Sequence, residues 1–244
     1  MNEKQISRIK SKLSLAKSVS ILTGAGISAE SGVPTFRGKG GLWRSYRAEE
    51  LATPEAFRRD PELVWEWYNM RREKIALLSP NMAHKALASF EKKTTDFTLI
   101  TQNVDGLHEE AGSRNILELH GNIWKVRCTG CGIVSENHDL PIDILPRCRE
   151  CGGLLRPHIV WFGEMLPADI ISSAYAALER CDILLVVGTS GVVQPAASMA
   201  SIARQAGAYV VELNIEKTPN SRVVDEAIAG KAAEILPTLL NDHA

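Results

Sequence analysis

The sequence has little net charge, few aromatic residues and no long apolar run. Its 28 Lys and Arg residues balance 29 Asp and Glu residues to a formal net charge of −1, so we expect no specific nucleic-acid partner and no membrane surface. No apolar run approaches the roughly 20 residues that cross a bilayer. Residues 1–17 show neither an apolar stretch nor a small-residue cleavage site, and we therefore expect a cytoplasmic protein. With 45% hydrophobic residues, the 244-residue chain can bury one substantial core and a small satellite domain.

Cysteine is scarce too, but four of the five cysteines are regularly spaced. Cys128 and Cys131 form a Cys-x-x-Cys pair, and Cys148 and Cys151 repeat it after sixteen residues. This spacing is typical of a zinc ribbon, in which four thiolates hold one tetrahedral ion. Two disulfides are the alternative, but they need an oxidising compartment that nothing else in the sequence indicates. Because four thiolates leave no open coordination position, we expect one structural Zn²⁺, and we expect Cys181 to be a buried bystander.

Five short apolar runs predict strands that are buried on both faces, at residues 19–22, 97–100, 116–119, 183–187 and 209–213. Helical patterns separate these runs along the chain. The alternation predicts an α/β fold with a Rossmann-like, doubly wound parallel sheet. In such sheets the ligand binds beyond the carboxyl ends of the strands, and all five of these ends are polar or rich in glycine.

Two stretches interrupt the alternation. Residues 38–93 carry helical patterns, at 61–78 and 81–93, without a buried strand, and residues 127–156 hold the two cysteine pairs. We interpret both as insertions that form a smaller domain, made of a helical part and a zinc ribbon. The Rossmann-like domain would then consist of residues 1–37, 94–126 and 157–244, with a cleft between the two domains.

The junction after the first predicted strand indicates a nucleotide site. Gly24 and Gly26 remove the β-carbons that would keep backbone N–H groups from a pyrophosphate, and a helix expected to start near Ser28 would point its positive end there. The pattern is only half of the dinucleotide fingerprint, because Ala29 stands at the third glycine and no acidic residue follows about 20 positions on. Residues 35–38, Thr-Phe-Arg-Gly, predict a flap over the ligand.

Two further strand ends carry candidate catalytic groups. Asn103 and Asp105 follow the second predicted strand, although such residues are also ordinary in turns and helix caps. His120 ends the third strand and is the best general base available, since an unperturbed pKa near 6.5 suits proton abstraction at neutral pH. A single histidine can equally be a satisfied polar residue. The histidines that we expect to be structural or solvated include His84, His108 and His138.

Together these motifs resemble the sirtuin family. The resemblance runs from about residue 19 to the C-terminus and includes residues 101–105, His-Gly-Asn at 120–122 and Gly-Thr-Ser at 188–190. Sirtuins use NAD to move the acyl group of a modified lysine onto ADP-ribose, so the resemblance implies nicotinamide and O-acyl-ADP-ribose as products. In the glycine-rich loop the matching residues are Gly24, Ala25, Gly26, Ile27, Ser28, Ser31, Gly32, Pro34, Phe36 and Arg37.

The resemblance also implies roles for individual residues. His120 would deprotonate a ribose hydroxyl, Asn103 would orient the nicotinamide ribose, and Asp105 would hold the carboxamide. Phe36 would shield the reacting carbon, and Arg37 would bind the phosphates. The residues implied in NAD binding are Gly24, Ala25, Gly26, Ile27, Ser28, Glu30, Phe36, Arg37, Gln102, Asn103, Val104, Asp105, Gly188, Thr189, Ser190, Asn214, Ile215, Glu216 and Ala232.

An acylated lysine in an extended segment of a target protein is the expected partner. Residues 159–164 have the apolar character of a strand that can pair with such a segment through main-chain hydrogen bonds, and a plain core strand is the alternative. The resemblance implies that Val160 accepts the amide N–H of the acylated lysine. The expected substrate-binding residues are Val160, Trp161, Phe162, Gly163 and Glu164, with Gly191 and Val192 on the opposite side of the peptide.

Tyr68 and Arg71 lie three residues apart in a predicted helix and therefore share one face. An Arg-Arg-Glu run is usually a solvated, salt-bridged face, which is the alternative interpretation. Sirtuins of the class that removes acidic acyl groups carry Tyr-x-x-Arg at this place. A guanidinium beside a phenol suits a terminal carboxylate, so the resemblance implies removal of succinyl and malonyl groups as well as acetyl.

Three other functions stay open at this point. A dehydrogenase would also use NAD, but the incomplete glycine fingerprint argues against it. A mono-ADP-ribosyltransferase needs the same nicotinamide cleavage, and a non-catalytic module would bind NAD or acyl-lysine without turnover. We rank these below a deacylase because His120, Asn103, Asp105 and Phe36 are all present.

Overall fold

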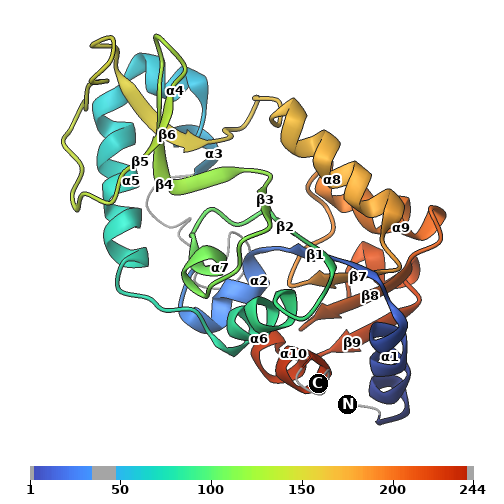
Figure 1. The fold of residues 1–244 in the computed structure, drawn as a ribbon. Helices are drawn as coiled ribbons and strands as arrows, with labels where there is room; N and C mark the ends of the chain where they lie inside the picture. Colours follow the sequence, from blue (N-terminus) through green and yellow to red (C-terminus); the bar gives the residue numbers. More distant parts are fainter. Residues whose placement is uncertain (1–2, 35–47, 241–244) are drawn as a thin grey trace.

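Six parallel strands form the main sheet of this computed structural model, which describes residues 3–34 and 48–240 (Figure 1). The strand order is β3-β2-β1-β7-β8-β9, and every neighbouring pair is parallel. The strands are β1 (Ser18–Thr23), β2 (Asp96–Thr101), β3 (Ile116–Glu118), β7 (Ile183–Val187), β8 (Tyr209–Asn214) and β9 (Glu226–Ala229). The predicted α/β class and all five predicted strands are confirmed. The edge strand β9 was not predicted, because its four residues, Glu-Ala-Ile-Ala, include only one large apolar side chain, Ile228.

Helices cover both faces of this sheet, with α1 (Glu3–Leu15), α6 (Met82–Glu91) and α10 (Ala232–Leu240) on one face and α8 (Ala168–Arg180) and α9 (Met199–Gln205) on the other (Figure 1). The first group packs against Ile21 and Leu185. The second packs against their neighbours Leu22 and Val186. Because successive strand residues point to opposite faces, one uninterrupted apolar run supplies both cores. This is the doubly wound arrangement that the sequence predicts.

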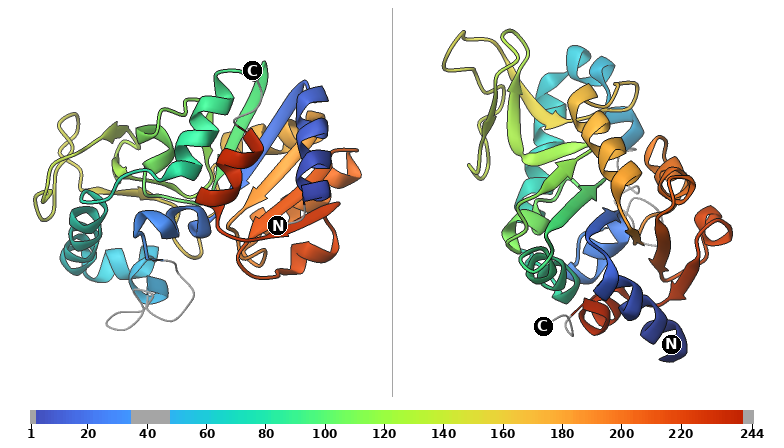
Figure 2. Two further views of the ribbon diagram at one scale, coloured as in Figure 1. Left: turned by 90° about the horizontal axis from the view of Figure 1, so that it is seen from below. Right: turned by 45° about the vertical axis from the view of Figure 1, so that its right-hand side comes forward.

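A second, antiparallel sheet with strand order β5-β4-β6 belongs to a smaller unit. Its strands and helices are β4 (Gly121–Cys128), β5 (Val134–Glu136), β6 (Leu155–Ile159), α3 (Ala48–Leu51), α4 (Pro54–Arg59) and α5 (Pro61–Ile75). Trp65 and Tyr68 of α5 share an apolar cluster with Ile123 of β4 and with Trp161. Both views in Figure 2 place this unit at one end of the molecule and β8 and β9 at the other.

The division of the chain into two domains remains a proposal. Helix α6, which the sequence assigned to the smaller domain, packs Ala83 and Leu87 into the same core as α1 and α10. Strand β4 begins at Gly121, inside a segment that the sequence assigned to the larger domain. We therefore propose domain boundaries near residues 80 and 120.

Two elements in the site region differ from the prediction. No helix starts at Ser28: α2 (Ala25–Ser28) is a single turn that starts at Ala25, and a 3₁₀ turn, η1 (Ala29–Ser31), follows it. So short a helix has little macrodipole to offer an anion. The strand expected at 159–164 ends at Ile159, because the N–H of Glu164 turns back to the carbonyl of Trp161 (3.0 Å).

The remaining short elements connect these parts. They are α7 (Leu107–Glu110) and two 3₁₀ turns, η3 (Ala196–Ser198) and η4 (Pro219–Arg222). The predicted helices 61–78 and 81–93 correspond to α5 and α6, which end a few residues earlier, at Ile75 and Glu91. Within residues 3–34 and 48–240, no helix combines the length and apolar character that a membrane span requires.

Candidate active site

Three glycines bring the turn after β1 against the carboxyl end of β7. A β-carbon on Gly26 would lie 2.6 Å from Cα of Gly188, and Gly188 itself has a φ of +61°. The N–H of Gly26 donates to the Gly188 carbonyl (2.8 Å), and the N–H of Gly24 donates to the Val187 carbonyl (3.0 Å). These two N–H groups therefore form hydrogen bonds with the end of β7. The sequence predicts a pyrophosphate as their partner. The glycines instead place residues 24–28 and 188–190 on one surface.

Polar side chains cross-link this carboxyl edge. The amide of Gln102 donates to the Thr189 hydroxyl (2.9 Å), and the amide of Asn214 donates to the Thr189 carbonyl (2.7 Å). Ser190 and Ile215 next to them are exposed. The ends of β2, β7 and β8 therefore form one continuous polar edge, as predicted from the parallel sheet.

Asn103 and Asp105 lie in a small cavity between the β1–α2 turn and α5. The amide of Asn103 donates to the Gly24 carbonyl and to the Ser28 hydroxyl, both at 3.1 Å. The carboxylate of Asp105 accepts the N–H of Leu107 (3.0 Å), and burial raises its pKa although this bond and one from Ser28 oppose the shift. The cavity is lined by Ala25, Val33, Pro34, Arg71, Lys74, Ile75, Asn103, Val104 and Asp105.

His84 supports this cavity from behind, which agrees with the structural role expected for it, although its contact with Ser28 was not predicted. Its Nδ1 accepts the N–H of Asn81 (3.3 Å), so we assign the proton to Nε2, which lies 3.3 Å from the Ser28 hydroxyl. Burial lowers the pKa of His84 to about 4, so the ring is neutral at pH 7. His108 packs edge-on against it (4.8 Å between centroids). The sequence can indicate that His84 lies near the start of α6, but it does not indicate the contact of His84 with Ser28.

His120 lies in the link between β3 and β4. Its Nδ1 is 3.0 Å from the Gln102 carbonyl, which can only accept, so the proton is on Nδ1 and Nε2 carries the lone pair. Burial lowers the pKa of His120, while the Gln102 bond opposes the shift. At neutral pH the ring is therefore in the form that a general base requires.

Tyr68 and Arg71 are buried on one face of α5, so the solvated-face alternative is excluded. The Tyr68 hydroxyl accepts the indole N–H of Trp161 (2.8 Å), and the Arg71 guanidinium lies over the ring of Trp67 (4.8 Å). Burial lowers the pKa of Arg71, and the nearby Tyr68 and Asp105 oppose this shift. Arg71 thus adds a buried cation to the wall that holds Asp105.

The turn at residues 160–164 is held from inside. The carboxylate of Glu164 binds both terminal nitrogens of Arg156 (2.5 and 2.9 Å) and the N–H of Trp161 (2.8 Å), so it is engaged within the protein. The N–H of Val160 donates to the His120 carbonyl (2.9 Å). Phe162 is about half exposed, at 52%. Residues 160–164 therefore form an anchored turn beside His120.

The remaining predicted NAD residues divide into three groups. Ala232 is buried at the start of α10, where the carboxylate of Glu30 accepts the N–H of Ala233 (3.0 Å). Glu216 is exposed after β8. Phe36 and Arg37 lie outside the described residues.

The four spaced cysteines converge at the far end of β4. Their Sγ atoms all lie within 4.8 Å of one another, with 3.4 Å between Cys128 and Cys151 and 3.8 Å between Cys131 and Cys148. All are unpaired thiols, which excludes the disulfide alternative. Zn–S bonds of about 2.3 Å give a tetrahedron with S–S edges of about 3.8 Å, so the donor set fits Zn²⁺.

A doubly wound sheet with an imidazole, an amide and a carboxylate gathered at its carboxyl edge defines a Rossmann-like, nucleotide-dependent enzyme with a structural zinc site. The chain belongs to the Sir2 family, whose model matches residues 24–195. This family is the one that the sequence motifs resemble.

Known relatives cover nearly the whole chain. It is 55% identical over 213 residues to an NAD-dependent protein deacylase of Aquifex aeolicus. The aligned residues cover 87% of this chain and 89% of that protein. A solved Sir2 homologue in complex with ADP-ribose is similar with a TM-score of 0.92 at 50% identity, over 99% of this chain and 96% of that one. A solved complex of Sir2 with a p53 peptide and NAD⁺ is similar with a TM-score of 0.85 at 31% identity, over 99% of this chain and 98% of that one.

Proposed function

We propose that the protein is an NAD-dependent protein-lysine deacylase that removes acetyl, succinyl and malonyl groups from lysine side chains. Family membership and relatives named NAD-dependent protein deacylase support the deacylase activity. The observation that carries the finer assignment is the burial of Arg71 in the same cavity wall as Asn103 and Asp105, with its guanidinium 5.7 Å from the ring of the buried Tyr68.

NAD supplies the reaction with a cleavable bond between ribose and nicotinamide. Asn103 would hold the nicotinamide ribose, and Asp105 would hold the carboxamide. The lone pair on Nε2 of His120 is available to accept a proton from a ribose hydroxyl, because the Gln102 carbonyl binds the other ring nitrogen. The assignment of these three residues to NAD is part of the proposal, as are the other NAD-binding residues named above.

Arg71 and Tyr68 would recognise the distal carboxylate of an acidic acyl group. A buried guanidinium favours an anionic partner and can bind a carboxylate through two parallel hydrogen bonds. Because the Tyr68 oxygen accepts the Trp161 N–H, the phenol proton can be donated to the same carboxylate. An acetyl group offers no such partner, so its removal should depend little on this pair.

The acylated lysine would enter within an extended segment that passes between residues 160–162 and residues 191–192. Main-chain recognition of this kind makes sequence preference weak. The complex of a Sir2 relative with a p53 peptide supports a peptide substrate for this chain.

Replacing Arg71 by methionine tests the acyl preference. We expect Arg71→Met to lower kcat/KM for a succinyl-lysine peptide about 10- to 100-fold, as loss of a charge-assisted hydrogen bond predicts, and to leave acetyl-lysine turnover nearly unchanged. Nicotinamide and deacylated peptide are measured together, on one peptide sequence carrying either group. Arg59→Met, which removes an exposed arginine of α4, is the control for net charge.

Equal losses on both peptides would contradict a role for Arg71 in acyl selection. If neither peptide is turned over and labelled ADP-ribose accumulates on protein, the protein is a mono-ADP-ribosyltransferase. Binding of NAD and acyl peptide without turnover would identify a non-catalytic module.

A further inference from the structure

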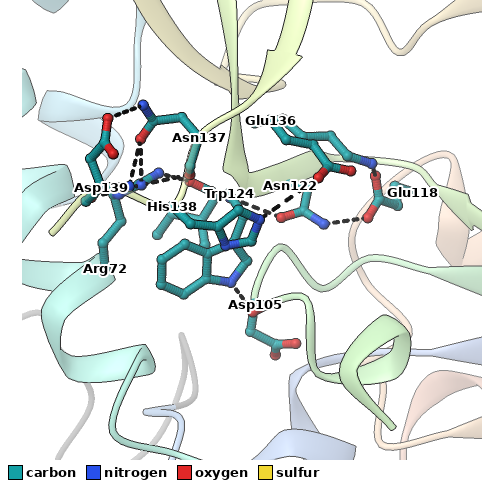
Figure 3. Close-up of polar contacts among 11 residues, drawn as sticks. Arg72, Asp105, Glu118, Asn122, Trp124, Glu136, Asn137, His138 and Asp139 are labelled. Atoms are coloured by element: carbon teal, nitrogen blue, oxygen red, sulfur yellow. Dashed lines mark hydrogen bonds and ion pairs between the residues drawn. The ribbon is translucent and has the colours of Figure 1, made fainter. Parts of the chain in front are cut away.

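The indole of Trp124 binds the backbone directly at Asp105. Its Nε1–H donates to the Asp105 carbonyl (2.9 Å), as Figure 3 shows. The residues just before these two are also bonded to each other: the N–H of Ile123 donates to the Val104 carbonyl (2.8 Å). Strand β4 of the small sheet therefore holds the loop after β2 at two successive carbonyls.

The ring also packs tightly on the turn that follows Asp105. Gly106 has a φ of +80°, and a β-carbon there would lie 2.7 Å from Cδ1 of Trp124. On the other side of this turn, the N–H of Leu107 binds the Asp105 carboxylate. Asp105 is thus anchored twice, through its carbonyl by Trp124 and through its carboxylate by Leu107.

Trp124 is itself held in place by α5 and by residues 137–139. The Arg72 guanidinium lies 4.9 Å from the indole, and it donates to the carbonyls of Ile123 (2.6 Å) and Asn137 (2.7 Å). The N–H of Asn137 in turn donates to the Trp124 carbonyl (2.8 Å), and the ring of His138 stacks on the indole at 5.5 Å and 10° (Figure 3). These contacts leave the indole little freedom to turn away from Asp105.

The N-terminal side of Trp124 is fixed as well. Its backbone N–H donates to the side-chain oxygen of Asn122 (2.9 Å), and the Asn122 amide donates to Glu118 (2.5 Å) at the end of β3. Glu118 also pairs with Lys125 (2.8 Å). The indole is therefore connected to the main sheet through Glu118 of β3 and to helix α5 of the smaller unit through Arg72.

We propose that Trp124 is a positioning residue for Asp105: its indole N–H fixes the peptide after Asp105 and so aims this carboxylate at the nicotinamide group of NAD. The inference rests on the proposed function, in which Asp105 holds the nicotinamide carboxamide. Rotation of the 105–106 peptide would move the Asp105 side chain relative to Asn103, and the Trp124 bond opposes this rotation. Trp124 makes no contact with the reacting groups in this proposal.

Trp124→Phe keeps an aromatic ring and removes the N–H. We expect it to raise the Kd of NAD, the KM for NAD and the nicotinamide concentration for half-inhibition by about 3- to 10-fold, the range of one neutral hydrogen bond. The Kd of ADP-ribose, which lacks nicotinamide, and the KM for the acyl peptide should stay the same. Calorimetry gives both Kd values without turnover, and steady-state kinetics give the rest.

Trp65→Phe is a matched control. The indole N–H of Trp65 also donates to a backbone carbonyl, that of Leu155 (3.0 Å), but Leu155 pairs with Cys128, at the opposite end of β4 from Asn122. Trp65→Phe should lower the melting temperature, and any change in the Kd of NAD should be matched by an equal change in the Kd of ADP-ribose. If phenylalanine proves too small for the site, β-(3-benzothienyl)alanine at position 124 exchanges only the N–H for sulfur.

Equal weakening of NAD and ADP-ribose in Trp124→Phe, or no weakening of either, would overturn the inference. Selective weakening of NAD relative to ADP-ribose in Trp65→Phe would overturn it too, because the selectivity would then follow from general loss of stability. A wild-type protein that binds NAD no better than ADP-ribose and shows no NAD-dependent turnover would instead count against the proposed function.

Discussion

Burial shifts the pKa of single side chains in the site, and it thereby influences their protonation states. Burial lowers the pKa of His120 and raises that of Asp105, because a charge of either sign loses hydration inside the protein. The sequence analysis assigned both residues to the site, but it used the unperturbed pKa of histidine. The structure adds that the imidazole is neutral with its proton on Nδ1.

The activity of wild-type protein should therefore persist into mildly acidic solution. Since the pKa of His120 is lowered from 6.5, the neutral, base-competent ring survives below pH 6.5, and the acid limb of kcat/KM should have its midpoint below that value. Turnover of an acetyl peptide across a pH series measures this midpoint. His138→Ala, at an exposed histidine, should give the same curve, and His120→Tyr should abolish turnover. A midpoint at or above 6.5 would show that another group controls the acid limb.

Elements meet at this site through close backbone approaches that the glycine pattern only partly indicates. The sequence shows Gly24 and Gly26 after a strand, and it predicts a ligand for them. The structure shows that their first partner is the end of β7, where Gly188 occupies the space that any side chain would need. Such a contact between residues far apart in the chain has no local signature, so sequence reasoning could not find it.

Gly188→Ala should disturb this junction more than a left-handed glycine elsewhere. Its β-carbon would lie 2.5 Å from the backbone nitrogen of Ile27, whereas one on Gly207, with a φ of +103°, would meet nothing within 4 Å. Both substitutions carry backbone strain, but only Gly188→Ala adds overpacking, which costs about 1–3 kcal/mol more in the free energy of unfolding. Urea unfolding and ADP-ribose binding of both variants test this. Equal destabilisation with unchanged binding would contradict the role of the contact.

At the scale of the whole molecule, the zinc ribbon lies at one end of a unit whose other end borders the active site, through β4 and α5. The four cysteines lie at the far end of β4, while the near end carries Asn122 and Trp124 against the Asp105 loop. Arg72 joins this strand to α5, which also carries Arg71 and Tyr68. Loss of the metal should therefore reach the site through β4 and α5.

Removal of zinc should abolish activity without a direct chemical effect. We expect a strong chelator to unfold the small antiparallel sheet and to stop turnover, while the parallel sheet keeps its own unfolding transition. Metal analysis, near-ultraviolet circular dichroism and turnover are followed on the same samples. Cys181→Ser should retain one zinc ion per chain, because Cys181 lies apart from the cluster. Full activity in metal-free protein would show that the ribbon is dispensable.

The sequence by itself determined five of the six parallel strands, the cysteine cluster and the shared helix face of Tyr68 and Arg71, because hydrophobic period, motif spacing and helical repeat are local properties of a chain. It also placed Asn103, Asp105 and His120 at strand ends, since parallel strands all end at one edge. Only the tertiary structure decided which groups are buried and what they touch. His84 behind Ser28 and Trp124 on Asp105 join segments that are far apart in sequence or lie in different sheets, and packing alone brings such segments together.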